Sequence, residues 1–162
     1  MKSRGVLFSF LVVLALLFFS SIAGTEETAY QEKKSFIENL VNEAANLIET
    51  KGQEGLDIIR EKNGRFNNND VYVFVTSGTT GADLFNPAFQ EIEGLSPENY
   101  TDPDAKAAQM IIVNAVKDKD TAWVEYLWPK PQETKPSKKI SYLKKIIING
   151  KIRIVGAGFY PE

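Results

Sequence analysis

The chain has 162 residues, 43% of them hydrophobic and 25% charged, which is the size and composition of one ordinary folded domain. It has no histidine and no cysteine, so the usual general base, zinc ligands, thiolate nucleophile and disulfides are excluded. Its formal net charge is −2, and an acidic surface repels phosphate backbones, so we expect no nucleic acid partner. The scattered carboxylates form no recognisable pair, and we expect no catalytic residues, no metal site and no cofactor.

The N-terminal segment, residues 1–23, predicts a secretory signal peptide. Lys2 and Arg4 precede a mostly apolar run over residues 6–19, and small residues of the kind found at cleavage sites follow. The alternative is an uncleaved anchor, because the apolar stretch is close to the roughly 17 residues that a spanning helix requires. We expect residues 24–162 to form a single domain that is periplasmic or secreted, and membrane-anchored if the segment is not cleaved.

The first part of this domain is predicted to be helical and then to change to strands. Residues 31–49 repeat apolar side chains with the spacing of an amphipathic helix, and residues 53–61 predict a shorter helix. The β-branched and aromatic run over residues 71–76 predicts a strand buried on both faces. Residues 82–87 predict a short antiparallel partner, which ends at its proline because proline cannot donate to a ladder.

The second part is predicted to contain one further helix and three strands. Asp102 followed by proline has the chemistry of a helix start, and residues 105–116 continue it as a helix. The strands are expected at residues 123–128, 140–148 and 151–159. Asn149–Gly150 predicts a tight hairpin between the last two strands. The order of elements predicts an α+β fold, in which a five-stranded antiparallel sheet carries a long N-terminal helix and a second helix packed on it.

Five short motifs follow one another along these strands: YVFV at 72–75, LFNP at 84–87, VEYLWPKP at 124–131, KKISY at 138–142 and GAGFY at 156–160. Together with Gly94 they resemble the single Cache domain, an extracytoplasmic relative of the PAS fold. The resemblance covers essentially all of the mature chain. It implies a PAS-like sheet of five antiparallel strands, with a small-molecule pocket between the sheet and the loop and helix that cover it.

The resemblance also implies a sensor, because Cache domains are the outer ligand-binding parts of chemoreceptors and histidine kinases. The expected ligand is a small organic molecule such as a carboxylate or an amino acid, under the loop over residues 85–104. Receptors of this kind continue into a second membrane helix and an output domain, whereas this sequence ends two residues after Tyr160. We therefore expect an exported sensor-type domain without its own output domain, partnered by a membrane receptor or a second copy. The alternative is an interaction or structural module that pairs through its N-terminal helix.

The expected ligand site is built from aromatic, amide and cationic side chains: Phe74, Asn86, Tyr126, Trp128, Lys139 and Tyr142. Strand alternation places Tyr126 and Trp128 on one face, where they either form a pocket wall or pack in the core under the long helix. By the resemblance, Lys139 and Tyr142 border the pocket, and they would converge on a carboxylate. The alternative for the lysine is a solvated residue that guards a sheet edge.

Three further side chains have two interpretations each. Phe74 shares a strand face with Tyr72, and this face is either the pocket floor or core. Asn86 is either a turn residue or a pocket hydrogen bonder; many Cache domains have histidine here, so asparagine alters the expected ligand preference. Asp102 is either the helix cap or a loop carboxylate that recognises the amine of an amino acid.

Overall fold

The computed structural model describes the backbone of residues 6–68 and 70–161, with side chains from residue 26 onward within those ranges. The chain divides into two units, residues 1–35 and 36–162. The first unit holds the N-terminal part of helix α1 (Val6–Lys51), in which Gln31 Nε2 donates a 2.7 Å hydrogen bond to Glu27 Oε1. The remaining described helices and strands all belong to the second unit.

The predicted signal segment, residues 1–23, lies outside the described side chains. Its role and the start of the domain at residue 24 therefore stay predictions. From residue 26 onward, no described helix combines the length and the apolar character that a membrane span requires.

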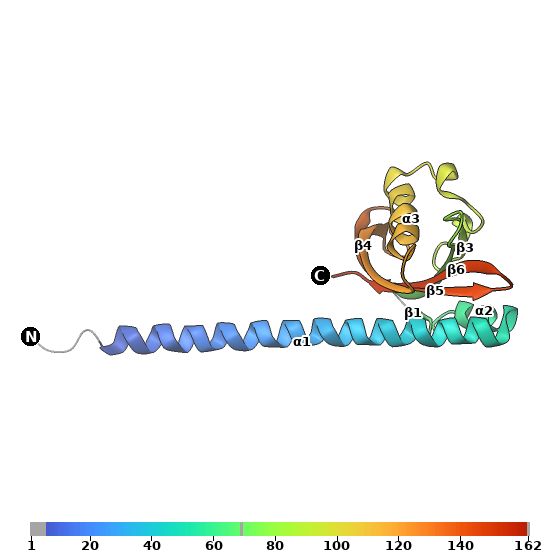
Figure 1. Cartoon of the computed structure of the whole chain (residues 1–162). Helices are drawn as coiled ribbons and strands as arrows, with labels where there is room; N and C mark the ends of the chain where they lie inside the picture. Colours follow the sequence, from blue (N-terminus) through green and yellow to red (C-terminus); the bar gives the residue numbers. More distant parts are fainter. Residues whose placement is uncertain (1–5, 69, 162) are drawn as a thin grey trace, which may run out of the picture. The chain divides into compact units, whose positions relative to one another are not determined.

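An antiparallel sheet forms the centre of the second unit (Figure 1). Its strands are β1 (Asn67–Asn68), β2 (Val71–Ser77), β3 (Asp83–Phe85), β4 (Thr121–Pro129), β5 (Pro136–Ile148) and β6 (Lys151–Phe159). The order across the sheet is β1-β2-β6-β5-β4, and β3 also pairs with β2. The last strand therefore lies between β2 and β5. All five predicted strands are confirmed, whereas β1 was not predicted, because asparagine is depleted in strands.

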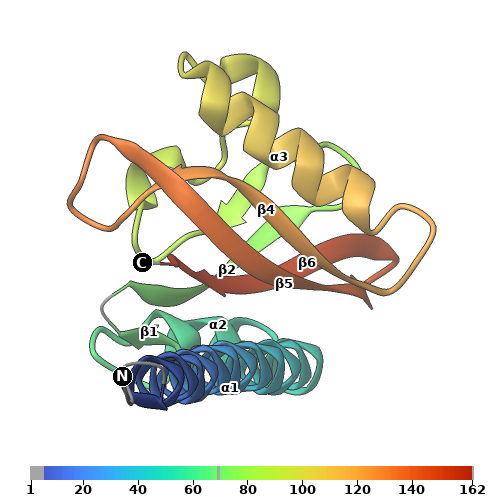
Figure 2. The same ribbon diagram turned by 90° about the vertical axis from the view of Figure 1, so that its left-hand side faces the viewer.

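Helices cover both faces of the sheet (Figure 2). The second-unit part of α1, residues 36–51, and α2 (Gln53–Arg60) lie on one face. On the other face lie α3 (Pro103–Ala115) and a loop that contains the short 3-10 helices η1 (Gln90–Ile92) and η2 (Pro97–Asn99). This α+β arrangement is the predicted fold class.

The predicted helix boundaries follow from local chemistry. Gly52 adopts a φ of 57°, which favours glycine, and ends α1 where the sequence predicted a break. Asp102 Oδ1 accepts hydrogen bonds from the backbone N–H groups of Asp104 at 2.8 Å and Ala105 at 3.4 Å. These bonds confirm Asp102 as the cap of α3, and its carboxylate is thereby engaged at the helix end.

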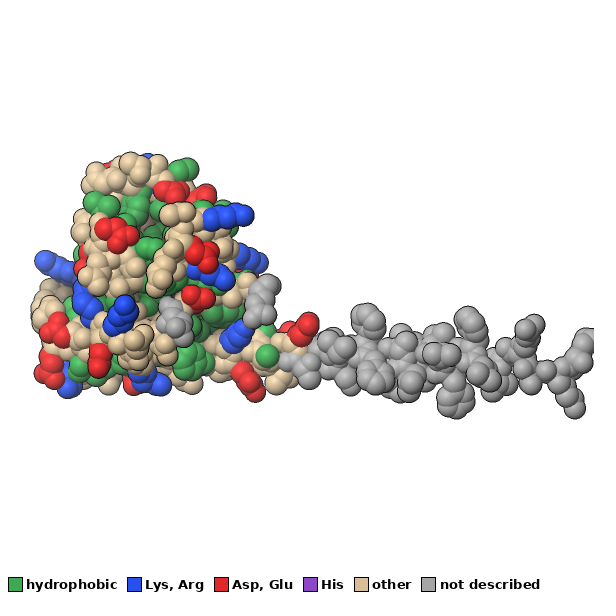
Figure 3. Space-filling model, turned by 180° about the vertical axis from the view of Figure 1, so that it is seen from behind, with side chains coloured by type: hydrophobic (Ala, Val, Ile, Leu, Met, Phe, Trp, Pro, Cys, Tyr) green, Lys and Arg blue, Asp and Glu red, His purple; other side chains and the backbone are tan. Residues whose placement is uncertain are grey.

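The sheet separates two apolar layers. Toward α1, the buried helix residues include Ile37, Leu40 and Val41. Toward α3, the aromatic face of β2 packs with residues of α3 and β4 in one cluster: Tyr72, Phe74, Ala108, Ile112, Val116, Ala122, Tyr126, Trp128, Leu143 and Ile154. Tyr126 and Trp128 of β4 therefore face α3, not the long helix. On the exposed surface seen in Figure 3, acidic and basic side chains are interspersed.

Candidate functional site

A narrow cavity lies in the aromatic layer between the sheet and α3. Its lining comes from β2, β3, β4, β5, α3 and the loop after β3: Tyr72, Phe74, Asp83, Asn86, Gln109, Ile112, Tyr126, Trp128 and Lys139. The space left free among these side chains is about 10 Å³, close to the volume that one water molecule requires. The cavity is thus nearly filled by its own side chains, most of which are polar or aromatic.

Lys139 of β5 places a cation in this apolar layer. Its side chain is 1% exposed, and Nζ lies 3.8 Å from the centroid of the Tyr72 ring. The ring centroids of Phe74 and Tyr160 are 5.4 and 5.5 Å from the same nitrogen. Burial lowers the pKa of Lys139 to about 7, against the opposing effect of Asp83. The three rings offset part of the cost of burying the ammonium by cation–π attraction.

Asp83 of β3 contributes the carboxylate of the cavity, and it is also 1% exposed. Its Oδ2 accepts hydrogen bonds from Asn86 Nδ2 at 3.2 Å and from Gln109 Nε2 at 3.4 Å. Its Oδ1 is buried and has no hydrogen-bond partner among the described residues. Burial raises the pKa of Asp83 to about 7. Although Asp83 and Lys139 line the same cavity, no ion pair within 4.0 Å joins these two described side chains.

Asn86 joins the cavity to the covering loop. The side-chain Oδ1 of Asn86 accepts a 3.2 Å hydrogen bond from the backbone N–H of Phe89. The backbone N–H of Asn86 donates a 2.6 Å hydrogen bond to Glu93 Oε1. Glu93 also pairs with Arg60 of α2 at 2.9 Å. Asn86 is therefore a turn residue that also lines the cavity, and its role as a hydrogen bonder to a ligand stays a prediction.

The aromatic wall is held by edge-to-face contacts and one hydroxyl bond. Trp128 meets Phe89 at a centroid distance of 5.9 Å and Tyr126 at 6.3 Å, with interplanar angles of 88° and 83°. The Tyr126 hydroxyl and Ser141 Oγ are 2.9 Å apart. The hydroxyl of Tyr72, in contrast, has no hydrogen-bond partner among the described residues. The wall is therefore packed as core while it still presents hydroxyl groups close to the cavity.

The structure brings five of the expected site residues together at the cavity, and their role in binding stays a prediction: Phe74, Asn86, Tyr126, Trp128 and Lys139. Tyr142 lies on the opposite face of β5, where its ring centroid is 5.2 Å from that of Trp123, its partner in register. Side chains of a strand alternate between its faces, so residues 139 and 142 point to opposite sides. The predicted convergence of Lys139 and Tyr142 is therefore wrong.

Sequence reasoning missed two polar residues of the cavity, Asp83 and Gln109. Gln109 is a polar residue beside the apolar positions of α3, and it is only 1% exposed. That interruption of the apolar face is a signal that could have identified it. Asp83 lies two residues before Phe85, so simple alternation assigns the two side chains to one face. The register shift in the β2–β3 pair changes this assignment.

Comparison with known proteins agrees with this description. A family model described as "Cache domain" matches residues 18–162. The methyl-accepting chemotaxis protein McpP of Pseudomonas putida is 27% identical over an alignment of 166 positions, which covers 94% of this chain and 29% of McpP. The chain thus spans less than a third of the length of this curated relative.

Solved structures show the same fold. A Cache chemosensory domain, solved to explain carboxylic acid recognition, is 25% identical, with a TM-score of 0.64 over 84% of this chain and 98% of that one. A periplasmic sensor domain of a chemotaxis protein is 23% identical, with a TM-score of 0.57 and coverage of 87% and 98%. A methyl-accepting chemotaxis protein of Vibrio parahaemolyticus, 15% identical, has a TM-score of 0.65 and coverage of 86% and 96%. The motifs, the antiparallel sheet and the family match agree, and the chain belongs to the Cache domain family.

Proposed function

We propose that this chain is an exported sensor domain that binds a small organic carboxylate in the cavity between the sheet and α3. The observation that carries the proposal is the buried ammonium of Lys139, which lines the cavity and forms no ion pair with a described carboxylate. Asp83 and Asp70 attract this cation without a direct ion pair. A buried cation that is not directly paired is costly, and an anionic ligand would pair with it. The similar Cache domain whose structure concerns carboxylic acid recognition supports this choice of ligand.

The groups around Lys139 suit a carboxylate. Hydroxyl groups of Tyr72 and Tyr126 belong to the same lining, and that of Tyr72 has no partner among the described residues. An ammonium and a hydroxyl together donate charge-assisted hydrogen bonds to both oxygens of a carboxylate. The aromatic rings of the wall would contact the hydrocarbon part of the ligand. Polar donors for the carboxylate beside aromatic rings for the hydrocarbon part favour a compact acid with a short carbon chain.

The free space of about 10 Å³ is too small for such a ligand as the side chains stand. Binding therefore requires side chains or the covering loop to move aside. The loop over residues 86–102, between β3 and α3, is the element best suited to this movement, because its own regular structure is limited to the 3-10 helices η1 and η2. The ion pair between Glu93 and Arg60 ties this loop to α2.

A thermal-shift screen of the full chain with small carboxylates and amino acids at millimolar concentrations tests the proposal. A ligand that binds only the folded state raises the melting temperature, and we expect at least one compound of the screen to do so. Lys139→Met should abolish the shift. Lys138→Met is the matched control, because Lys138 is exposed on the same strand and pairs with Glu125.

The control should keep the full shift, since Lys138 lies on the other face of the strand from Lys139. If no compound raises the melting temperature, the carboxylate proposal is wrong. Self-association of the chain through its N-terminal helix would then favour the interaction module instead.

A further inference from the structure

The carboxylate of Asp83 has one oxygen held and one oxygen free. Both side-chain amide donors, from Asn86 and Gln109, reach Oδ2, whereas buried Oδ1 has no partner among the described residues. Buried carboxylate oxygens are expected to accept hydrogen bonds, because leaving one unpaired costs free energy. An unpaired acceptor on the wall of a cavity therefore indicates a donor that the ligand brings.

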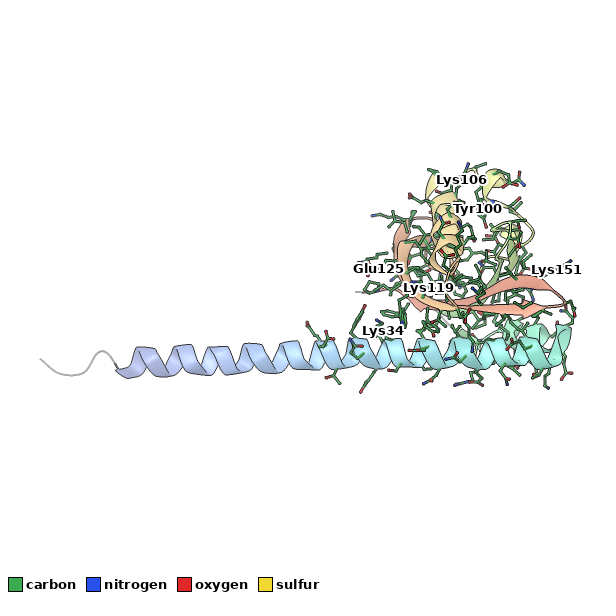
Figure 4. The ribbon with its side chains drawn as sticks, in the orientation of Figure 1. Lys34, Tyr100, Lys106, Lys119, Glu125 and Lys151 are labelled. Carbon is green, nitrogen blue, oxygen red and sulfur yellow. The ribbon has the colours of Figure 1, made fainter. Side chains whose placement is uncertain are left out.

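The orientation of this carboxylate is fixed by the surrounding structure. The Asn86 amide presents its nitrogen to Asp83 because its oxygen accepts from the backbone N–H of Phe89 at 3.2 Å. The Gln109 amide is fixed in the same way, since its Oε1 accepts from Thr76 Oγ1 at 3.4 Å. With both amide nitrogens directed at Oδ2, Oδ1 remains the free acceptor. The hydroxyl of Tyr100, on the α3 side of the sheet in Figure 4, also has no partner among the described residues and does not donate to Oδ1.

The cavity thus offers a cation and an anion that are not paired with each other. A ligand with only a carboxylate would satisfy Lys139 and would add a second negative charge near Asp83. A ligand with a donor next to its carboxylate would satisfy both groups. Lys139 and Asp83 line the same small cavity, so the ligand that displaces the surrounding side chains least carries its two polar groups on neighbouring atoms.

We propose that Asp83 is a second ligand-binding group, which selects carboxylates that carry a hydroxyl or an ammonium on the carbon next to the carboxylate. This inference rests on the proposed carboxylate site and narrows its ligand class. Lys139 binds the carboxylate of the ligand, and Asp83 Oδ1 accepts the hydrogen bond from the neighbouring substituent. Glu93, the other acidic group near Asp83, is engaged by Arg60 and by the backbone of Asn86.

Isothermal titration calorimetry of the full chain with propionate, L-lactate and L-alanine tests this selection. The three compounds share a three-carbon skeleton and differ in the substituent on the second carbon. We expect lactate or alanine to bind at least about tenfold more tightly than propionate, the usual effect of a hydrogen bond to a charged group. Asp83→Asn should reduce this preference, most of all for alanine, because an ammonium cannot accept a hydrogen bond from the new amide.

Asp102→Asn is the matched control, because asparagine caps a helix as well as aspartate does and Asp102 is not part of the cavity lining. It should keep the preference of the unaltered chain.

Propionate binding as tightly as both other acids would overturn the role of Asp83 and would leave the carboxylate site standing. An unchanged preference in Asp83→Asn would also overturn it. Binding of none of the three would overturn both proposals. The comparison of ligands on the unaltered chain decides the question even if the variant does not fold.

Discussion

The ammonium of Lys139 lies 3.8 Å from the centroid of the Tyr72 ring, although the two residues come from strands that are not neighbours in the sheet. The strand between them, β6, carries Gly156 and Gly158, which pair with Leu143 and Ser141 of β5. Glycine leaves this part of the sheet surface without side chains. The lysine can therefore reach across β6 to the ring, and no described side chain of β6 is among those that line the cavity.

Gly158→Ala should lower the free energy of unfolding by about 1–3 kcal/mol, the usual cost of adding a methyl group to a packed site. A Cβ at this position would contact Ser141 Oγ and the Ile140 carbonyl oxygen, and a backbone atom cannot move aside cheaply. Urea unfolding measures the change. Lys151→Ala, at an exposed position of the same strand, is the control and should change stability by less than about 0.5 kcal/mol. Equal stability of both variants would contradict the close packing of β6 on β5.

Replacing Lys139 should change how stability depends on pH. The pKa of Lys139 is lowered from 10.5 to about 7, so between these values the unfolded chain binds more protons than the folded chain. Stability contributed by this group is present above pH 10.5 and is lost as the pH falls toward 7. Lys139→Met should flatten the profile and should raise stability at pH 7 by on the order of 1–4 kcal/mol. Urea unfolding at several pH values from 7 to 10, with Lys138→Met as the control, measures this. A parallel profile for Lys139→Met and the unaltered chain would show that Lys139 is not buried.

The raised pKa of Asp83 should make the stability of the fold depend on pH with the opposite sign, and at lower pH. Its pKa is raised from 3.8 to about 7, so the folded chain binds more protons than the unfolded chain in this range. Stability from this group is present below pH 3.8 and is lost as the pH rises through 7. Asp83→Asn should remove this loss and should make the chain more stable at pH 7. Thermal unfolding from pH 4 to 7 measures the effect, and Asp102→Asn should follow the unaltered chain. No difference between the two variants would argue against the burial of this carboxyl group.

Replacing Tyr126 or Tyr142 by phenylalanine compares a hydroxyl group at the cavity with one on the opposite face of the sheet. Tyr126→Phe loses the buried bond to Ser141 and should cost about 1 kcal/mol of stability. Because this hydroxyl also borders the cavity, the variant should bind a carboxylate about threefold to tenfold more weakly. Tyr142→Phe should leave the affinity unchanged, because Tyr142 contacts Trp123 on the other face. Calorimetry with the best acid from the screen measures both, and equal losses would mean that the two hydroxyls share one environment.

Much of the fold could be predicted because its periodicities are strong. The alternation of β2 correctly separated Tyr72 and Phe74 from Val73, and the Asn149–Gly150 signal located the hairpin between β5 and β6. The same alternation placed Tyr126 and Trp128 on one face. It could not tell which helix covers that face, because the choice depends on how the chain crosses the sheet. The aromatic wall packs against α3, and the second-unit part of α1 lies on the other face of the sheet (Figure 2).

The carboxylate of the cavity could not be predicted by counting along β3. Thr76 pairs with Asp83, whereas its neighbour Val75 pairs with Phe85, so the strand is out of register by one residue between them. This bulge turns Asp83 and Phe85 to opposite faces, although they are two residues apart. A motif that contains LFNP therefore suggests apolar packing, and the ionisable side chain just before it is easily overlooked.

Strand β5 presents a different partner on each of its faces. On one face it carries Lys139 into the cavity, and five residues later Lys144 donates a 2.8 Å hydrogen bond to Asn42 of α1. A shift of this strand along its axis would move both lysines together, because a paired strand is stiff over so short a distance. β5 is thus the one strand whose lysines reach both the cavity and, through Asn42, the second-unit part of α1 among the described residues.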